Sequence, residues 1–281
     1  MDRKDYPLAF KTYLQALSKS PHTIKQYVLD AEQFVAHAAD AVIDAALVAS
    51  YADMLRATYT SANSINRKLA ASRQFLLFLH SRGYVGAGLI DLLQPLPKNK
   101  SELTVYTPAQ VKKIRAVFPH ARTVAETEEH SWLALRNGLI VELIALYGLK
   151  PAEITEMRWP HVLLDNKLLR IRYKNAERDI EMSEAMVEAF RYYWEETKRF
   201  MPIAEEVPHI WLGIGNQQGA PITVKTTERI FHFVTNTVGF KVTATNLRYA
   251  AIKSAEEDAV LYKQFGYARK DILLERKGRM K

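Results

Sequence analysis

The chain has 281 residues, which is long enough for two domains that each bury a hydrophobic core. Hydrophobic residues make up 48% and charged residues 25%, as in an ordinary soluble globular protein. There is no cysteine, which excludes disulfides and thiolate metal sites, and the net charge is +8. We expect a cytoplasmic protein without membrane association, because the longest apolar stretches are short and the N-terminus opens no apolar signal region.

The positive charge is uneven along the chain. Residues 263–281 carry seven Lys and Arg against two acidic residues, and residues 1–100 carry twelve against eight. Basic residues placed in this way attract phosphates and speed the encounter with a polyanion. A merely solvated surface would have the same composition, so charge alone leaves both interpretations open.

Residues 1–97 predict a bundle of four helices. Apolar residues recur at helical spacing over 10–17, 24–35, 46–58 and 65–81. Ser20 followed by Pro21 is a typical start for the second helix, as the N-cap and the first helical residue. At 100° per residue, Asn66 and Arg73 share one flank of the fourth helix, while Arg67 lies opposite its core stripe.

A linker is predicted over residues 98–104, within a region that has two prolines and no apolar periodicity. A second domain then covers 105–281, and its first helix starts at Thr107 and Pro108. The largely apolar segment 132–147 predicts the central helix of its core. Alternating apolar and polar residues predict a β-hairpin over 167–182, with its turn at 174–176. Helices follow at 184–199, at 225–238 and toward the end, so the fold class is mainly α with one small antiparallel β-hairpin or sheet.

Five segments carry motifs, in an order that one known family shares. They are 20–27 (SPHTIKQY), 66–75 (NRKLAASRQF), 147–153 (YGLKPAE) with MRW at 157–159, 174–178 (KNAER) and 244–249 (ATNLRY). Together they resemble the tyrosine recombinase (phage integrase, Xer-like) family over nearly the whole chain. The resemblance implies an N-terminal helical core-binding domain of the SAM-like type and a C-terminal domain with the tyrosine recombinase catalytic fold.

The resemblance also implies that the two domains form a C-shaped clamp around double-stranded DNA. Contacts with phosphates would dominate the affinity and make it depend on salt. The first domain would supply these contacts from Thr23, Lys25, Arg67, Lys68 and Arg73. The second domain would supply them from Lys150, Lys174, Arg178 and Arg248.

Members of this family cleave DNA with a tyrosine that attacks a phosphodiester. Two arginines bind the extra negative charge on the phosphate, while histidines and a hairpin lysine assist proton transfer. By position, Arg248 matches the second arginine and Lys174 matches the lysine. Lys150 takes the place of the first arginine, and it keeps the charge without the planar fork.

The remaining catalytic positions hold other residue types. Thr245, Tyr249 and Tyr267 stand where the family has histidines, and the nucleophile is expected nine residues after Tyr267, at Arg276. No tyrosine follows Tyr267, and little chain follows Arg276, which argues against cyclic assembly through a C-terminal helix. The chain therefore resembles a degenerate member of the family that lacks most catalytic residues.

The resulting prediction is a DNA-binding protein that has lost strand cleavage. It would be a repressor, an accessory factor for an active recombinase or an architectural protein, with self-association on DNA as a further option. No cofactor or metal is expected, since the eight histidines show no metal-ligand spacing. An enzymatic role stays open as an alternative, with Tyr267 or Tyr262 as the nucleophile. A protein-interaction scaffold that does not bind DNA is the third alternative.

Each candidate residue also has a purely structural interpretation. Lys150 could be a lysine that the dipole at a helix C-terminus favours. Arg248 could be an ion-pair partner, for example of Glu153. Tyr267 could serve packing alone, and Lys174 could simply be exposed at a turn.

Overall fold

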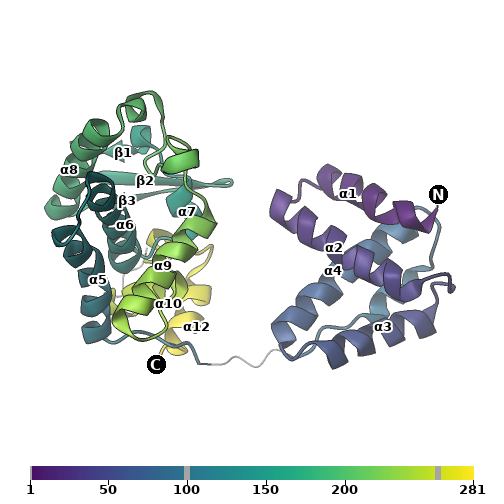
Figure 1. The fold of residues 1–281 in the computed structure, drawn as a ribbon. Coiled ribbons are helices and arrows are strands. Elements are labelled where there is room, and N and C mark those ends of the chain that lie inside the picture. The colour runs from purple at the N-terminus through teal and green to yellow at the C-terminus, as the bar shows by residue number, and fades with distance from the viewer. Residues whose placement is uncertain (1, 98–101, 257–260) are drawn as a thin grey trace. The chain divides into compact units, whose positions relative to one another are not determined.

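The computed structural model describes residues 2–97, 102–256 and 261–281. The chain divides into two compact units, Met1–Lys100 and Ser101–Lys281, which are described separately below (Figure 1). Residues 98–101 of the predicted linker lie outside the described residues, so the domain boundaries at 97 and 105 stay predictions. No helix in the described part of the chain is both long and apolar enough to cross a membrane.

The N-terminal unit is helical over its described residues, as the sequence predicts. Its elements are the short 3-10 helix η1 (Arg3–Asp5), α1 (Tyr6–Ala16), α2 (Pro21–Ala38), α3 (Ala45–Thr58), α4 (Ala62–Ser81) and η2 (Ala87–Leu92). The predicted N-cap of α2 is confirmed, because the Ser20 hydroxyl accepts a hydrogen bond from the backbone N–H of Thr23. Such a cap satisfies one of the backbone donors left free in the first turn of a helix.

Aromatic rings fill the centre of this unit. The Phe75 ring meets Phe10 at 5.1 Å and Phe34 at 5.8 Å between centroids, both edge to face. Asn66 on α4 is buried, and its side-chain amide exchanges hydrogen bonds of 2.9 and 2.7 Å with the backbone of Leu96. The flank of α4 that carries Asn66 therefore holds the segment after η2 in place.

The C-terminal unit surrounds a long apolar helix, α6 (Glu128–Tyr147), with other helices and a small sheet (Figure 1). The remaining helices are α5 (Pro108–Thr123), α7 (Pro151–Thr155), α8 (Glu184–Phe200), α9 (Val224–Val238), α10 (Ala244–Ser254), α11 (Leu261–Gln264) and α12 (Lys270–Gly278), with 3-10 turns η3 (Trp159–His161), η4 (Pro202–Glu206) and η5 (Gly215–Gln217). Buried residues occur on all sides of α6, since helices and the sheet enclose it.

The predicted β-hairpin is confirmed, with strands β2 (Leu168–Tyr173) and β3 (Ala176–Glu181). Tyr173 pairs with Ala176, which leaves Lys174 and Asn175 as the two-residue loop. Lys174 takes a positive φ of 55°, as such tight hairpin loops require. A third antiparallel strand, β1 (Val162–Leu163), pairs with β2, and the sequence did not predict it because two residues show no alternation.

Candidate functional site

Arg248 lies where the two arginine-type motifs of the sequence meet. It is on α10 and only 6% exposed. Its guanidinium donates one hydrogen bond to the carbonyl of Gly148, at the end of α6, and another of 2.6 Å to the carbonyl of Phe265. Arg248 therefore joins α10 to two other segments, and these two bonds occupy part of its guanidinium fork.

Gly148 makes this close approach possible. It ends α6 with a left-handed φ of +59°, and a Cβ built on it would lie 2.6 Å from the Phe265 ring. Substitution would therefore force both an unfavourable backbone and a clash.

Gly148→Ala is expected to destabilise the C-terminal unit by about 2–4 kcal/mol, from the left-handed backbone and the overpacking together. Gly239→Ala is the matched control, because Gly239 ends α9 with φ +78° but has open space around its Cβ position. It should cost only about 1 kcal/mol. Urea unfolding of the two variants measures the difference, and equal losses would refute the role of the Phe265 contact.

A second cluster is organised by one buried carboxylate. Glu153 on α7 is 2% exposed, and Arg178 from β3 donates to its two oxygens at 3.0 and 2.9 Å. The Lys150 ammonium lies 3.2 Å from Glu153 Oε1, and the backbone N–H of Lys150 donates to Oε2 at 2.9 Å. Glu153 thus joins two of the predicted DNA-contacting residues. The structural interpretation of Arg248 as the partner of Glu153 is wrong, because Arg178 and Lys150 take that place.

The surroundings of Glu153 shift its pKa. Burial alone raises the pKa of the carboxyl, but the hydrogen bonds and charge of Arg178, with Lys150, outweigh burial and hold the pKa below its ordinary value of 4.5. A lowered pKa means that the ionised carboxylate stabilises the fold above the unfolded-state pKa, and that this contribution is lost as the pH falls through the folded-state pKa.

The difference in unfolding free energy between the wild type and Glu153→Gln should therefore narrow as the pH falls below 4.5. Urea titrations at neutral and acidic pH measure that difference. Other carboxylates titrate alike in both proteins, so their contribution to the unfolding free energy cancels in this difference. A difference that stays constant down to acid pH would show that the Glu153 pKa is not lowered.

An open cleft of about 600 Å³ adjoins the cluster. Lys150, Arg178 and Tyr267, all predicted site residues, line it together with Lys263. The acidic lining residues are Glu153, Glu177 and Asp179, and the last two pair with arginines of the hairpin. The cleft is thus not a strongly cationic surface. Among the described residues, no group of three or more His, Asp or Glu could hold a metal ion there or elsewhere.

Tyr267, which lines this cleft, lies between two arginines. Its ring centroid is 5.3 Å from the Arg248 guanidinium and 5.5 Å from that of Arg276. Its hydroxyl oxygen is buried and has no hydrogen-bond partner among the described residues. Arg276 also donates a hydrogen bond to the Tyr249 hydroxyl at 3.3 Å. The residue at the position expected for the nucleophile is therefore a cation that stacks on one tyrosine and hydrogen-bonds to another.

Lys174 lies apart from these residues. It is exposed in the loop between β2 and β3, where the hairpin projects from its unit (Figure 1). Its ammonium is 5.4 Å from the ring centroid of Tyr173, and it does not line the cleft, although Tyr173 does. Tyr262 is half-buried in a small apolar cluster with Tyr267 and Phe265.

The candidates of the N-terminal unit differ in how accessible they are. Arg67 forms two hydrogen bonds with Asp30, and its side chain stays 41% exposed. The ammonium of Lys68 is buried and donates to Asp30 at 2.8 Å and to Gln33 at 2.7 Å. To meet a phosphate, Lys68 would have to leave both partners.

The other three candidates of this unit have fewer constraints. Arg73 is half-buried and has no ion pair within the described part of the chain, and Lys25 is exposed. The Thr23 hydroxyl lies 2.8 Å from that of Ser20, at the start of α2. Lys25 and Arg73 are therefore the freer cations for an external partner.

Two family models match the chain. One is described as the phage integrase N-terminal SAM-like domain and covers residues 9–83, and the other, the phage integrase family, covers residues 110–271. The chain belongs to the phage integrase family.

Named relatives of this integrase-family chain are tyrosine recombinases. A XerD-like tyrosine recombinase of Streptococcus suis is 26% identical over 179 residues, 64% of this chain and 66% of the relative. Tyrosine recombinase XerC of Mycobacterium bovis is 25% identical over 201 residues, 69% of this chain and 66% of the relative. The matched region thus spans just under two thirds of the length of these relatives.

The fold of this integrase-family chain is similar to that of lambda integrase. The structure of a lambda integrase (75–356) dimer bound to a COC′ core site matches with a TM-score of 0.70 over 98% of this chain and 94% of that one, at 13% identity. A match at this identity shows the fold alone. It confirms the predicted fold class, with a SAM-like N-terminal domain and an integrase catalytic domain.

The sequence did not lead us to predict that Glu153 binds Lys150 and Arg178. A signal was present, because Glu153 follows the N-cap residue Lys150 by three positions, with Pro151 between them. That spacing is typical of a capping box, in which the glutamate accepts a hydrogen bond from the N-cap backbone. The bidentate pair with Arg178 had no signal, because it joins residues from two elements that only the tertiary fold brings together.

Proposed function

We propose that this chain is a DNA-binding protein of the phage integrase family that does not cleave DNA. Its role would be accessory, regulatory or architectural in recombination or integration. Its partner would be double-stranded DNA, together with an active recombinase or a second copy of the chain. The observation that carries the proposal is the engagement of Arg248, whose buried guanidinium donates to two backbone carbonyls and stacks on Tyr267.

The DNA-binding part rests on exposed cations and on the solved relatives. Lys150 and Lys263 adjoin the cleft, Lys174 extends from the hairpin, and Lys25 is exposed on α2. Lambda integrase, whose fold this chain shares, has been solved bound to DNA. Lysines act as point charges that attract phosphates without fixing a geometry. Such contacts hold a duplex but do not aim donors at one scissile phosphate.

The proposed loss of cleavage rests on the surroundings of the residues at the family's catalytic positions. Phosphoryl transfer needs donors aimed at the developing charge and a nucleophile activated by a nearby base. Lys150 supplies only a point charge, and its ammonium is paired with Glu153. Arg178 uses two of its donors to bind the same carboxylate. The one phenol enclosed by the cluster, Tyr267, has a buried hydroxyl with no base beside it among the described residues. Thr245, in a histidine position, is exposed and cannot transfer a proton at neutral pH.

Strand cleavage can be tested directly with a nicked suicide substrate built on a genomic fragment that footprinting shows to be bound. We expect no covalent DNA–protein adduct in a denaturing gel after prolonged incubation, because no activated nucleophile faces the cleft. An active XerC recombinase on its own site serves as the positive control. An adduct that is lost in Tyr267→Phe or Tyr262→Phe would overturn the proposal in favour of an active recombinase with a rearranged site.

A further inference from the structure

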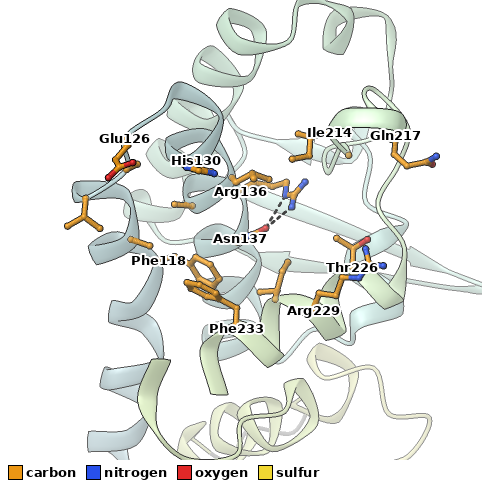
Figure 2. Close-up of a pocket in the computed structure, with 17 residues that line it drawn as sticks. Phe118, Glu126, His130, Arg136, Asn137, Ile214, Gln217, Thr226, Arg229 and Phe233 are labelled. Carbon is orange, nitrogen blue, oxygen red and sulfur yellow. Dashed lines mark hydrogen bonds between the residues drawn. The ribbon is translucent and has the colours of Figure 1, made fainter. Parts of the chain in front are cut away.

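A second pocket of about 640 Å³ opens in the C-terminal unit, formed by α5, the loop 124–126, α6, the segment 213–217 and α9. It shares no lining residue with the cleft around Lys150 and Tyr267. Its volume lies in the range of cavities that bind drug-sized molecules. Figure 2 shows its side chains, and they divide into an apolar part and a cationic part.

The apolar part is built around two aromatic rings. Phe118 on α5 and Phe233 on α9 stack at 5.5 Å between centroids with 24° between their planes. Phe233 is 47% exposed, and Val124 beside the same pocket is 62% exposed. An open apolar surface of this kind gains free energy when a hydrophobic group covers it.

The cationic part contains a buried arginine without a counter-ion. Arg136 on α6 is 4% exposed, and its guanidinium donates to the Leu212 carbonyl at 2.6 Å and to Asn137 Oδ1 at 3.0 and 2.9 Å (Figure 2). No carboxylate pairs with it within the described residues. Burial lowers the pKa of this guanidinium, which still stays charged at neutral pH. Buried charges in proteins are normally paired, so the site lacks a negative charge.

A second arginine, Arg229, lines the same pocket as Arg136. It is on α9 with Thr226, is exposed, and forms no ion pair with any described residue. The one acidic lining residue, Glu126, lies at the other end, away from both arginines (Figure 2). The end of the pocket that holds Arg136 and Arg229 is therefore cationic, and the rest of the pocket is mainly apolar.

We propose that this pocket binds a small amphiphilic carboxylate, with its apolar body against Phe118 and Phe233 and its carboxylate toward Arg136 and Arg229. The exposed Arg229 guanidinium can offer a planar carboxylate two parallel donors. Arg136 contributes its uncompensated charge, because its own parallel donors are used by Asn137. The stacked rings favour a flat or extended apolar body over a sugar or a nucleic-acid backbone. The proposal is independent of DNA binding, since none of these residues lies among the candidate DNA contacts.

A matched pair of probes separates the carboxylate from the apolar body. Biphenyl-4-carboxylate and the neutral biphenyl-4-methanol share one ring system, and calorimetry on the full chain gives the affinity of each. We expect the carboxylate to bind about tenfold more tightly, because a charged hydrogen bond in a partly buried site exceeds a neutral one. Equal affinities, or no binding of either probe, would overturn the proposal.

Variants on α9 locate the site. Arg229→Gln should weaken the carboxylate about three- to fivefold, as expected for an exposed charge, and leave the alcohol unchanged. Phe233→Ala should weaken both probes. The control is Lys225→Gln, because Lys225 is an exposed cation on the same helix outside the pocket, and it should change neither. A loss of carboxylate affinity in Lys225→Gln equal to that in Arg229→Gln would show attraction by net charge and refute the assigned site.

Discussion

Glu153→Gln is expected to lower the unfolding free energy of the C-terminal unit by about 3–5 kcal/mol, the typical loss when one partner of a buried ion pair is removed. The glutamine keeps the size and one acceptor oxygen, so the change removes charge rather than packing. Arg178, whose side chain is 12% exposed, would then remain buried without a counter-charge. Lys150 would lose the same partner, although its side chain is 40% exposed and can turn to solvent.

The measurement can be restricted to one unit. All four tryptophans of the chain lie in the C-terminal unit, at positions 132, 159, 194 and 211. Tryptophan fluorescence during urea unfolding therefore reports this unit and not the N-terminal one. Glu177→Gln is the control, because Glu177 pairs with hairpin arginines at the surface and its loss should cost less than about 1 kcal/mol. Similar losses in the two variants would contradict the role given to Glu153.

A double variant tests whether the cost comes from the unpaired charge. Glu153→Gln combined with Arg178→Gln removes both partners, so it should cost less than the sum of the two single variants. Two neutral amides can hydrogen-bond to each other, and neither carries an uncompensated charge. Additive losses would mean that Glu153 and Arg178 stabilise the fold separately, for example through the bond of Arg178 to the Gln264 carbonyl.

The helices of both units could be predicted from the sequence because their signals are local. Ser20 and Thr107 each act as the N-cap before a proline, and α2 and α5 start there. The alternation on both sides of Lys174 predicts β2 and β3, and the tight loop follows from their pairing. The strand β1 has only two residues, which is too short for periodicity to register.

The roles of the site residues could not be predicted, because they depend on contacts between distant segments. The motif gives Arg248 its position, but the Gly148 carbonyl that accepts its hydrogen bond lies 100 residues away. Lys68 looks free in the sequence, and only the packing of α2 against α4 places Asp30 against its ammonium. A residue type and its spacing show what chemistry is possible. The partners that the fold supplies decide which donors and charges of that residue remain free for a ligand.

The affinity for duplex DNA is expected to fall about a hundredfold between 50 and 200 mM salt, if about four phosphates are neutralised. A random-sequence duplex of about 30 base pairs tests this by fluorescence anisotropy, since phosphate contacts do not need a specific site. Absent or salt-insensitive binding would favour a protein-interaction scaffold over a DNA-binding protein.

Lys174→Ala should reduce the slope of log affinity against log salt by about one, as expected for the loss of one phosphate contact. Lys167, in the turn between β1 and β2, is a closely matched control. Both lysines have a positive φ, 55° for Lys174 and 53° for Lys167, so alanine strains the backbone alike in both variants. Lys167 differs in that it pairs with Glu184, whereas Lys174 has no ion pair among the described residues. An equal change of slope in both variants would show that net charge attracts the DNA, and that the hairpin loop does not contact it.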